Sequence, residues 1–319
     1  MLPLRSIEIR SEPIVSECRC LRSRFRPHDC KRCQSVCPEG AIETLAGSVR
    51  VEPSRCSGCM LCVAACPTET LQAPGKGFLE MVEGLSEASE PVLGCENQAR
   101  AAGHERVHCL GRLALEHLVA LRVFVDGPVT LNATACADCP RGAALGPLKR
   151  RMKTVARLWL GEGVANLRLA EDPGDLRFEP VIGDRRWLFR SLEKGIARRV
   201  SAGLDRRSVA SPAGALKTCP EKTRLLAAAL QRLPKELNAV ASEACLPRIR
   251  LTESCDECGR CASVCPTGAL VKRTSDGQRS LATMASRCNA CGICMSFCGR
   301  DGIEVEPGWI LREGEELGA

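Results

Sequence analysis

Large aromatic side chains are scarce in this sequence, and tyrosine is absent. Its 319 residues include three Trp and six Phe. A core with so few rings must be held by aliphatic packing or by bonds of another kind. No run approaches the roughly 18 consecutive apolar residues of a membrane-spanning helix, so we expect no membrane span.

The beginning of the chain lacks the features of an export signal. MLPLRSIEIRSEPIVSEC has neither the apolar core of a signal peptide nor a twin arginine, so we expect a cytoplasmic protein. Cysteine, in contrast, is abundant, with 23 residues. Many of these cysteines are grouped with gaps of two or three residues. In a reducing compartment such grouping indicates thiolates that share metal centres rather than a disulfide scaffold.

Eight cysteines between residues 255 and 298 form two similar half-motifs, CDECGRCASVCP and CNACGICMSFCG. The spacing Cys-x2-Cys-x2-Cys-x3-Cys-Pro is the ligand pattern of bacterial [4Fe–4S] proteins, in which the fourth cysteine binds the neighbouring cluster. One predicted ligand set is therefore Cys255, Cys258, Cys261 and Cys298, and the other is Cys265, Cys288, Cys291 and Cys294. Two zinc sites are the alternative, although zinc needs no remote fourth ligand.

The N-terminal repeat of this pattern is irregular. Residues 56–67 read CSGCMLCVAACP and, with a remote ligand from the preceding half-motif, predict the set Cys37, Cys56, Cys59 and Cys62. In the other half-motif, position 27, where the first cysteine is expected, is Pro. We expect Cys20 or Cys18 to complete the second set through a longer loop, together with Cys30, Cys33 and Cys66. A three-ligand or lost cluster is the alternative.

Residues 18–71 and 255–305 resemble the bacterial-type ferredoxins that hold two [4Fe–4S] clusters. The resemblance implies a ferredoxin-like α+β fold for each module, four [4Fe–4S] clusters in the chain, and one-electron transfer as the activity. The segments between the half-motifs read as β-hairpins with turns at 46–47 and 275–277.

The middle of the chain alternates candidate strands and helices, which indicates a small open α/β sheet. It carries the cysteines Cys95, Cys109, Cys136 and Cys139. The stretches VHCLGRL and ACADCP resemble the delta (iron–sulfur) subunit of methyl-viologen-reducing hydrogenase, although Cys136 and Cys139 are one residue closer together than in that family. The resemblance implies a [2Fe–2S] cluster on these four cysteines and a heterodisulfide-reductase-type partner. A dithiol or disulfide pair at Cys136 and Cys139, a zinc site, and buried structural cysteines are the alternatives.

Together these patterns predict an α+β protein in which two ferredoxin-like dicluster modules flank a small central α/β domain. The expected boundaries are 1–75 and 246–319 for the modules, 88–175 for the central domain, and 176–245 for a basic, partly helical connecting segment. Lys and Arg outnumber Asp and Glu by 22 to 11 in residues 140–249. We expect the basic stretch 141–207 to dock on an acidic redox enzyme subunit. No nucleic-acid-binding module is recognisable, so nucleic acid is not the expected partner.

The sequence has no glycine-rich dinucleotide loop, no Walker loop and no catalytic-triad pattern. We therefore predict a multi-cluster electron-transfer protein that is the relay subunit of a cytoplasmic oxidoreductase complex. One alternative is a thiol/disulfide oxidoreductase in which Cys136 and Cys139 react and the clusters supply electrons. A redox sensor that binds nucleic acid is a third class. Cys219 and Cys245 have no close-spaced partners and are expected to be free structural thiols.

Overall fold

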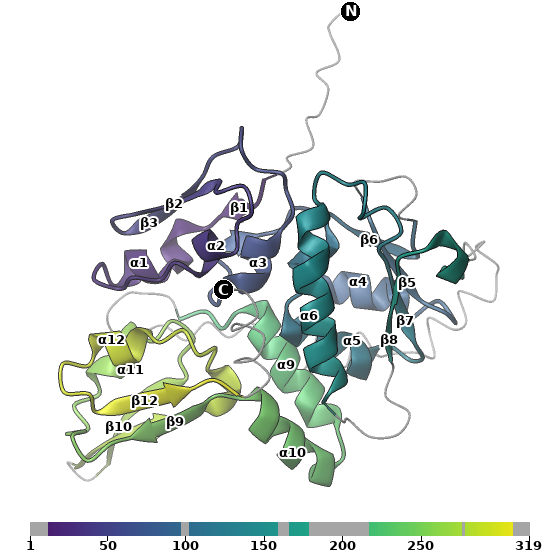
Figure 1. Ribbon diagram of the computed structural model, residues 1–319. Helices are drawn as coiled ribbons and strands as arrows, with labels where there is room; N and C mark the ends of the chain where they lie inside the picture. Colours follow the sequence, from purple (N-terminus) through teal and green to yellow (C-terminus); the bar gives the residue numbers. More distant parts are fainter. Residues whose placement is uncertain (1–11, 97–101, 159–165, 179–216, 276–277, 309–319) are drawn as a thin grey trace, which may run out of the picture.

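The structure is a computed structural model that describes residues 12–96, 102–158, 166–178, 217–275 and 278–308 (Figure 1). It is a mixed α/β protein with three parts. A cysteine-rich region lies at each end of the chain, and we call these the N-terminal region (12–72) and the C-terminal region (248–308). The central domain has a parallel four-stranded sheet. None of the helices in the described ranges is long and apolar enough to cross a bilayer.

The N-terminal region is built from two antiparallel strand pairs and short helices. Strand β1 (Ile14–Val15) pairs with β4 (Leu71–Gln72), and β2 (Ile42–Leu45) forms the expected hairpin with β3 (Ser48–Val51). Gly47 in the hairpin turn has φ = +84°, which glycine adopts without strain. The helices are η1 (Glu17–Arg19), α1 (Leu21–Arg24), α2 (Arg32–Ser35) and α3 (Leu61–Ala65).

The C-terminal region repeats this arrangement. Its first strand, β9 (Arg248–Leu251), pairs with its last, β12 (Ile303–Glu306), while β10 (Leu270–Ser275) and β11 (Gln278–Thr283) form a hairpin whose turn at 276–277 lies outside the described residues. The helices are α11 (Arg260–Val264), η5 (Ala285–Arg287) and α12 (Ile293–Phe297). The sequence repeat of the cysteines is therefore also a repeat of strand pairing.

The central domain has the alternation of strands and helices that the sequence indicates. Strands β6 (Glu105–Val107), β5 (Val92–Cys95), β7 (Val129–Asn132) and β8 (Leu167–Ala170) lie in that order, and each neighbouring pair is parallel. The helical elements are α4 (Phe78–Leu85), η2 (Leu110–Arg112), α5 (Leu115–Phe124), η3 (Gly142–Ala144), α6 (Leu145–Ala156) and η4 (Pro173–Asp175). Parallel neighbours need crossover connections, and α5 and α6 follow β6 and β7 in this role.

The main hydrophobic core lies in the central domain, and helices from the segment 176–245 complete it. Helices α9 (Glu221–Arg232) and α10 (Lys235–Cys245) follow Pro220 and Pro234. Leu225 and Ala229 of α9 are buried in the same cluster as Leu118 and Leu121 of α5. The described part of this segment is thus a component of the central core, whereas 179–216 lie outside the described residues.

The two cysteine-rich regions pack directly against each other. Leu21 of α1 shares a small buried cluster with Val264 of α11 and Ile293 of α12. The rings of Phe25 and Phe297 meet edge to face, with their centroids 5.1 Å apart. This contact joins the N-terminal region to the C-terminal region, which lie next to each other as the purple and yellow parts of Figure 1.

Candidate metal centres

Four thiols of the N-terminal region line one small cavity. We call them the inner N-terminal set: Cys20, Cys30, Cys33 and Cys66. Burial raises the pKa of the Cys33 thiol to about 12, and the three neighbouring thiols add to this shift. Cys20 is buried next to α1, whereas Cys18 is exposed. The structure thus brings Cys20, and not Cys18, to the cavity.

A second cavity in the same region is lined by the outer N-terminal set, Cys37, Cys56, Cys59 and Cys62. The chain turns tightly before α3, because Gly58 and Met60 have φ = +74° and +61°. Burial raises the pKa of the Cys62 thiol, and Cys33 is among the neighbouring thiols that add to the shift. Cys62 and Cys33 therefore mark the place where the two N-terminal sets adjoin.

The eight cysteines of the C-terminal region fall into the two expected groups. The outer C-terminal set is Cys255, Cys258, Cys261 and Cys298, and the inner C-terminal set is Cys265, Cys288, Cys291 and Cys294. Burial raises the pKa of Cys261 to about 11, and the other thiols of its set add to the shift. The pKa of Cys294 is raised by burial, then by the thiols of its own set, and then by Cys261. Cys294 and Cys261 therefore join the two C-terminal sets.

Backbone amides donate to the remote cysteine of three sets. Each donor lies four residues further along: Ala41 N–H to Cys37 Sγ at 3.3 Å, Thr70 N–H to Cys66 Sγ at 3.2 Å, and Gly302 N–H to Cys298 Sγ at 3.3 Å. The inner C-terminal set differs, because Ala269 N–H donates to Thr267 Oγ1, which lies 3.5 Å from Cys265 Sγ. Donors of this kind stabilise a negatively charged sulfur.

The loop after each of these four cysteines contains a left-handed residue. Gly40, Glu69, Gly268 and Asp301 have φ of +56°, +52°, +70° and +52°. Glycine adopts this conformation freely, but a residue with a Cβ is strained there by about 1 kcal/mol. Glu69 therefore occupies a position where glycine would be the simpler choice.

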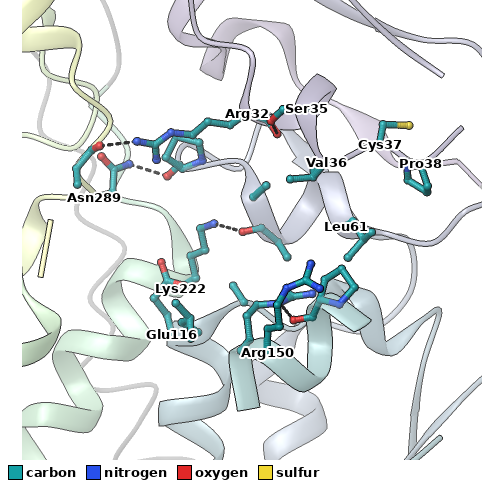
Figure 2. Close-up of a pocket in the computed structure, with 18 of the residues that line it drawn as sticks. Arg32, Ser35, Val36, Cys37, Pro38, Leu61, Glu116, Arg150, Lys222 and Asn289 are labelled. Carbon is teal, nitrogen blue, oxygen red and sulfur yellow. Dashed lines mark hydrogen bonds between the residues drawn. The ribbon is translucent and has the colours of Figure 1, made fainter. Parts of the chain in front are cut away.

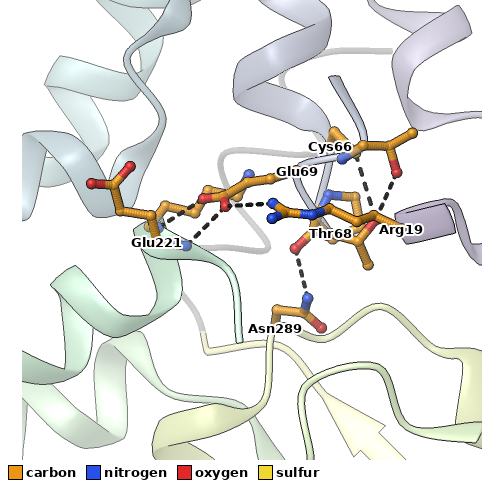
Figure 3. A network of polar contacts seen from close by, with 9 residues as sticks. Arg19, Cys66, Thr68, Glu69, Glu221 and Asn289 are labelled. Carbon is orange, nitrogen blue, oxygen red and sulfur yellow. Dashed lines mark hydrogen bonds and ion pairs between the residues drawn. The ribbon is translucent and has the colours of Figure 1, made fainter. Parts of the chain in front are cut away.

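The Glu69 side chain fastens this loop to the rest of the molecule (Figure 3). Its carboxylate accepts the N–H groups of Glu221 and Lys222, both at 2.9 Å, at the start of α9. Arg19 forms an ion pair with the same carboxylate at 3.8 Å. Because the first N–H groups of a helix have no partner within it, a carboxylate at this end stabilises the helix.

The four central cysteines also come together. Cys95 ends β5, Cys109 precedes η2, and Cys136 and Cys139 lie in the loop after β7; all four line one cavity, and we call them the central set. Burial raises the pKa of Cys109 to about 12 and that of Cys136 to about 11. The carboxyl ends of neighbouring parallel strands form the usual binding edge of an open α/β sheet.

The central set adjoins the outer N-terminal set. Cys109 shares a buried cluster with Cys59, and a Cβ added to Gly111 would overlap the Cys59 carbonyl oxygen. Arg141 spans the contact, because Nε donates to Ser57 O at 2.8 Å and Nη1 donates to His108 O at 3.0 Å. Only glycine at position 111 allows the two backbones to approach so closely.

Comparison with known families assigns the two cysteine-rich regions. Residues 28–70 and 254–301 match the family model of the 4Fe–4S dicluster domain. The chain contains two such domains. Among curated relatives, Protein NrfC of Escherichia coli (strain K12) is 41% identical over 66 residues, which are 18% of this chain and 29% of NrfC. Electron transport protein HydN of the same strain is 54% identical over 35 residues, or 11% of this chain and 20% of HydN. The chain thus matches less than a third of the length of either relative.

The donor sets of the two dicluster domains and of the central domain suit iron–sulfur clusters. Every predicted ligand is a thiol, and the N-terminal and central sets each surround a cavity. A single zinc ion would instead need four sulfurs about 2.3 Å from one point. Thiols arranged around a space fit a cluster better than a lone ion.

Two cations, Lys222 and Arg32, lie beside the inner N-terminal set. Lys222 of α9 is 3% exposed, and its Nζ donates to Ala64 O at 2.8 Å. Burial opposes ionisation of the Cys66 thiol, but the charge of Lys222 and nearby hydrogen-bond donors lower its pKa below 9.0. Arg32 of α2 donates to Ala290 O of the C-terminal dicluster domain at 3.0 Å. No spacing rule could find Lys222, because it comes from a helix remote in sequence.

Cys219 also lies closer to a set than its sequence position suggested. Thr218 N–H donates to Pro266 O at 2.9 Å, so the segment before α9 runs beside the inner C-terminal set. Burial raises the pKa of the Cys219 thiol to about 11, with Cys265 among its neighbours. Cys245 is fully buried in the central core, as expected for a structural thiol.

A cavity of about 470 Å³ lies where both dicluster domains meet α5, α6 and α9 (Figure 2). Cys37 forms part of its wall together with apolar side chains such as Val36 and Leu61. Its charged lining residues are Arg32, Arg150, Arg151, Lys222 and Glu116. The wall therefore carries four cations against one carboxylate.

Proposed function

We propose that this chain is an iron–sulfur electron-transfer protein that relays electrons between other redox enzyme subunits in the cytoplasm. In this proposal each dicluster domain has a ferredoxin-like fold and holds two [4Fe–4S] clusters in its inner and outer sets. When bound, such clusters accept and donate single electrons. The observation that supports the proposal best is the gathering of sixteen cysteines into four groups of four; fifteen of them lie in the two matched dicluster domains, and Cys20 lies just before the first.

The chain's own residues would hold, shield and tune these centres. The thiols provide the bonds, and burial of Cys66 and Cys265 keeps water away from the inner sets. The amide donors and the Lys222 ammonium lie where they offset negative charge on sulfur. Hydrogen bonds and positive charge near a cluster favour its more negative, reduced state. We therefore expect the inner N-terminal cluster to have the higher potential in its domain.

We further propose that the central set holds a fifth cluster, of the [2Fe–2S] type. The support is that thiols from three separate loops line one cavity beside the outer N-terminal set. A thiol/disulfide exchange site at Cys136 and Cys139 would need only two of these four thiols. The cluster proposal accounts for Cys95 and Cys109 as well, and we prefer it for that reason.

The partner is proposed to be an acidic redox subunit that docks through the basic stretch 141–207. Helix α6 carries part of this charge, but its cations differ in role. Arg151 is buried and donates to the carbonyl oxygens of Gly111 and Leu113, so it stabilises the fold. Lys153, and Arg157 directly after the end of the helix, are exposed and would meet a partner. Complementary charge of this kind mainly speeds association.

Anaerobic purification followed by iron and sulfide analysis tests the proposal. Four [4Fe–4S] clusters require about 16 iron and 16 sulfide per chain, and the additional [2Fe–2S] cluster raises both to about 18. Zinc in place of iron, with no acid-labile sulfide, would refute an electron-transfer role. Iron and sulfide near 16, with a complete set of [4Fe–4S] signals in electron paramagnetic resonance (EPR), would refute only the fifth cluster.

A further inference from the structure

Each set of thiols adjoins the next, and the contacts define one order. Cys261 of the outer C-terminal set and Cys294 of the inner one are buried in the same cluster. Cys33 of the inner N-terminal set packs against the buried cluster that contains Cys62 of the outer one. Cys59 then neighbours Cys109 of the central set. These three contacts leave one link to be identified, the step between the two dicluster domains.

That link lies at the contact of the inner sets. Cys30 and Cys291 both pack against the buried cluster formed by Leu21, Val264 and Ile293. The two cysteines belong to different dicluster domains, and the rings of Phe25 and Phe297 pack against the same cluster. His28 also lies at this junction, because its Nδ1 accepts the Cys30 N–H and its side chain forms a hydrogen bond with the backbone of Cys291. The inner sets therefore meet across a largely apolar contact that contains one imidazole.

Arg32 spans this contact. Its guanidinium donates to Ala290 O at 3.0 Å, one residue before Cys291. Its own backbone N–H donates toward the Cys30 thiol, and its charge acts on both Cys30 and Cys291. Asn289 holds the same junction from the other side, since Nδ2 donates to Pro67 O at 2.6 Å. One cation is thus shared by two sets from opposite ends of the chain.

We propose that the five sets form a single unbranched electron path, with Arg32 as the positioning residue at the crossing between the dicluster domains. The path runs from the outer C-terminal set through the inner C-terminal, inner N-terminal and outer N-terminal sets to the central set. This inference rests on the proposed function. Electrons then exchange with partners at the two ends of the path, the outer C-terminal set and the central set. Each of these sets has half-buried thiols in a loop that reaches the surface, as the exposed residues Asp256 and Asp138 show.

The crossing can be tested by replacing Arg32 and measuring both inner clusters. Arg32→Glu places a negative charge beside both inner sets, so both inner clusters are expected to become harder to reduce. Arg55→Glu is the matched control, because Arg55 donates to Glu39 O, also at 3.0 Å, within the N-terminal dicluster domain. Redox titration followed by EPR reports the midpoint potentials. Because Arg32→Lys keeps the positive charge, its midpoint potentials are expected to stay close to those of the unmodified chain.

A second measurement does not depend on whether Arg32→Glu folds, because it uses a chain that keeps Arg32. The outer clusters are removed by Cys56→Ser with Cys59→Ser and by Cys255→Ser with Cys258→Ser. The two remaining [4Fe–4S] clusters, those of the inner sets, are expected to show spin–spin interaction in the fully reduced state. The proposed path would be overturned if Arg32→Glu changed the midpoint potential of only one inner cluster. It would also be overturned if the two inner clusters showed no spin–spin interaction. Loss of iron and sulfide from the unmodified chain would instead refute the proposed function itself.

The cavity shown in Figure 2 supports a second, independent inference. Its volume of about 470 Å³ lies in the range of small-molecule sites. Arg151 and Lys222 donate to backbone carbonyls, but the guanidinium of Arg150 makes no hydrogen bond or ion pair to another described residue. Lys149, its neighbour in α6, is paired with Glu171 outside the cavity. Arg150 is therefore the cation most available to a ligand.

We infer that this cavity binds an aromatic organic anion of mononucleotide size, with its phosphate or carboxylate on Arg150. The apolar wall formed by Val36, Leu61 and Pro147 would contact the ring system. Glu116 is the one carboxylate in the wall, and it disfavours a second negative group near α5. The site is distinct from the five thiol sets, although Cys37 brings it beside one of them.

Equilibrium dialysis of the cluster-loaded full chain against flavin mononucleotide tests this site. We expect saturable binding that falls at least tenfold in Arg150→Ala and is unchanged in Lys149→Ala. Riboflavin, which lacks the phosphate, is expected to bind more weakly. The inference is refuted if flavin mononucleotide is not retained at about 1 mM. Equal retention by Arg150→Ala, or equal retention of riboflavin, would refute it as well.

Discussion

Glu69 offers the sharpest test of how the dicluster domain is attached to the rest of the molecule. Its backbone is left-handed with φ = +52°, and its side chain is 17% exposed because it caps α9. The equivalent residue in the C-terminal domain is Gly268. Glu69→Gly would therefore relieve strain in the loop while removing the cap from the helix.

The two effects can be weighed. Losing two charge-assisted hydrogen bonds costs about 3 kcal/mol, at about 1.5 kcal/mol each. Relief of the left-handed strain returns about 1 kcal/mol. The net loss of about 2 kcal/mol corresponds to an opening of the first turn of α9 that is about 30-fold more frequent. The amides of Glu221 and Lys222 should exchange with solvent faster by that factor.

Hydrogen–deuterium exchange of the anaerobic protein measures this change. Asp301→Gly is the matched control, since Asp301 has the same φ, and its exposed side chain makes no hydrogen bond or ion pair within the described residues. It should gain about 1 kcal/mol and leave α9 unaffected. Unchanged exchange at Glu221 and Lys222 in Glu69→Gly would show that the cap contributes nothing, and the reasoning would be wrong.

Three further predictions concern single side chains. His117 is buried, and burial holds its pKa well below 6.5, so the unfolded chain takes up a proton that the folded chain does not. Stability should therefore fall as the pH drops below 6.5, and thermal unfolding of His117→Gln should show a weaker dependence, the remainder coming from His28, whose pKa burial also lowers. Thr267→Val removes the hydroxyl 3.5 Å from Cys265 Sγ and should lower the midpoint potential of one cluster, whereas Thr267→Ser should not. Cys139→Ser should remove about two iron atoms per chain and leave the [4Fe–4S] EPR signals unchanged; a chain that keeps its full iron content would contradict the central set.

The local features of the fold were predictable because they are encoded in short stretches. The prediction of two dicluster domains is confirmed by the family match, and the small central α/β sheet is present, with strand pairing that is parallel throughout. Cysteine spacing works well here, since two- and three-residue gaps constrain a loop regardless of its surroundings. The choice between Cys18 and Cys20 was beyond this rule, because both precede the same loop and only burial separates them.

The contacts between distant parts could not be read from the sequence. Lys222 lies in α9, whose pattern carries no sign of a cysteine set nearby. Arg32 lies between Cys30 and Cys33, but nothing in the sequence shows that it reaches Ala290 of the other dicluster domain. Arg151 looked like one more surface charge of a basic helix, yet it is buried and bonded to carbonyl oxygens. Long-range packing decides each of these roles, and sequence periodicity reports only which face of an element is apolar.

The junction of Leu21 with Val264 and Ile293 has a consequence for how the protein is made. Leu21 is translated more than 200 residues before Val264 and Ile293. The junction can therefore form only after both dicluster domains have been synthesised. Cys30 is covered by that closure. Iron and sulfide delivered to the first dicluster domain would therefore reach its inner thiols most easily during translation, before the last domain docks.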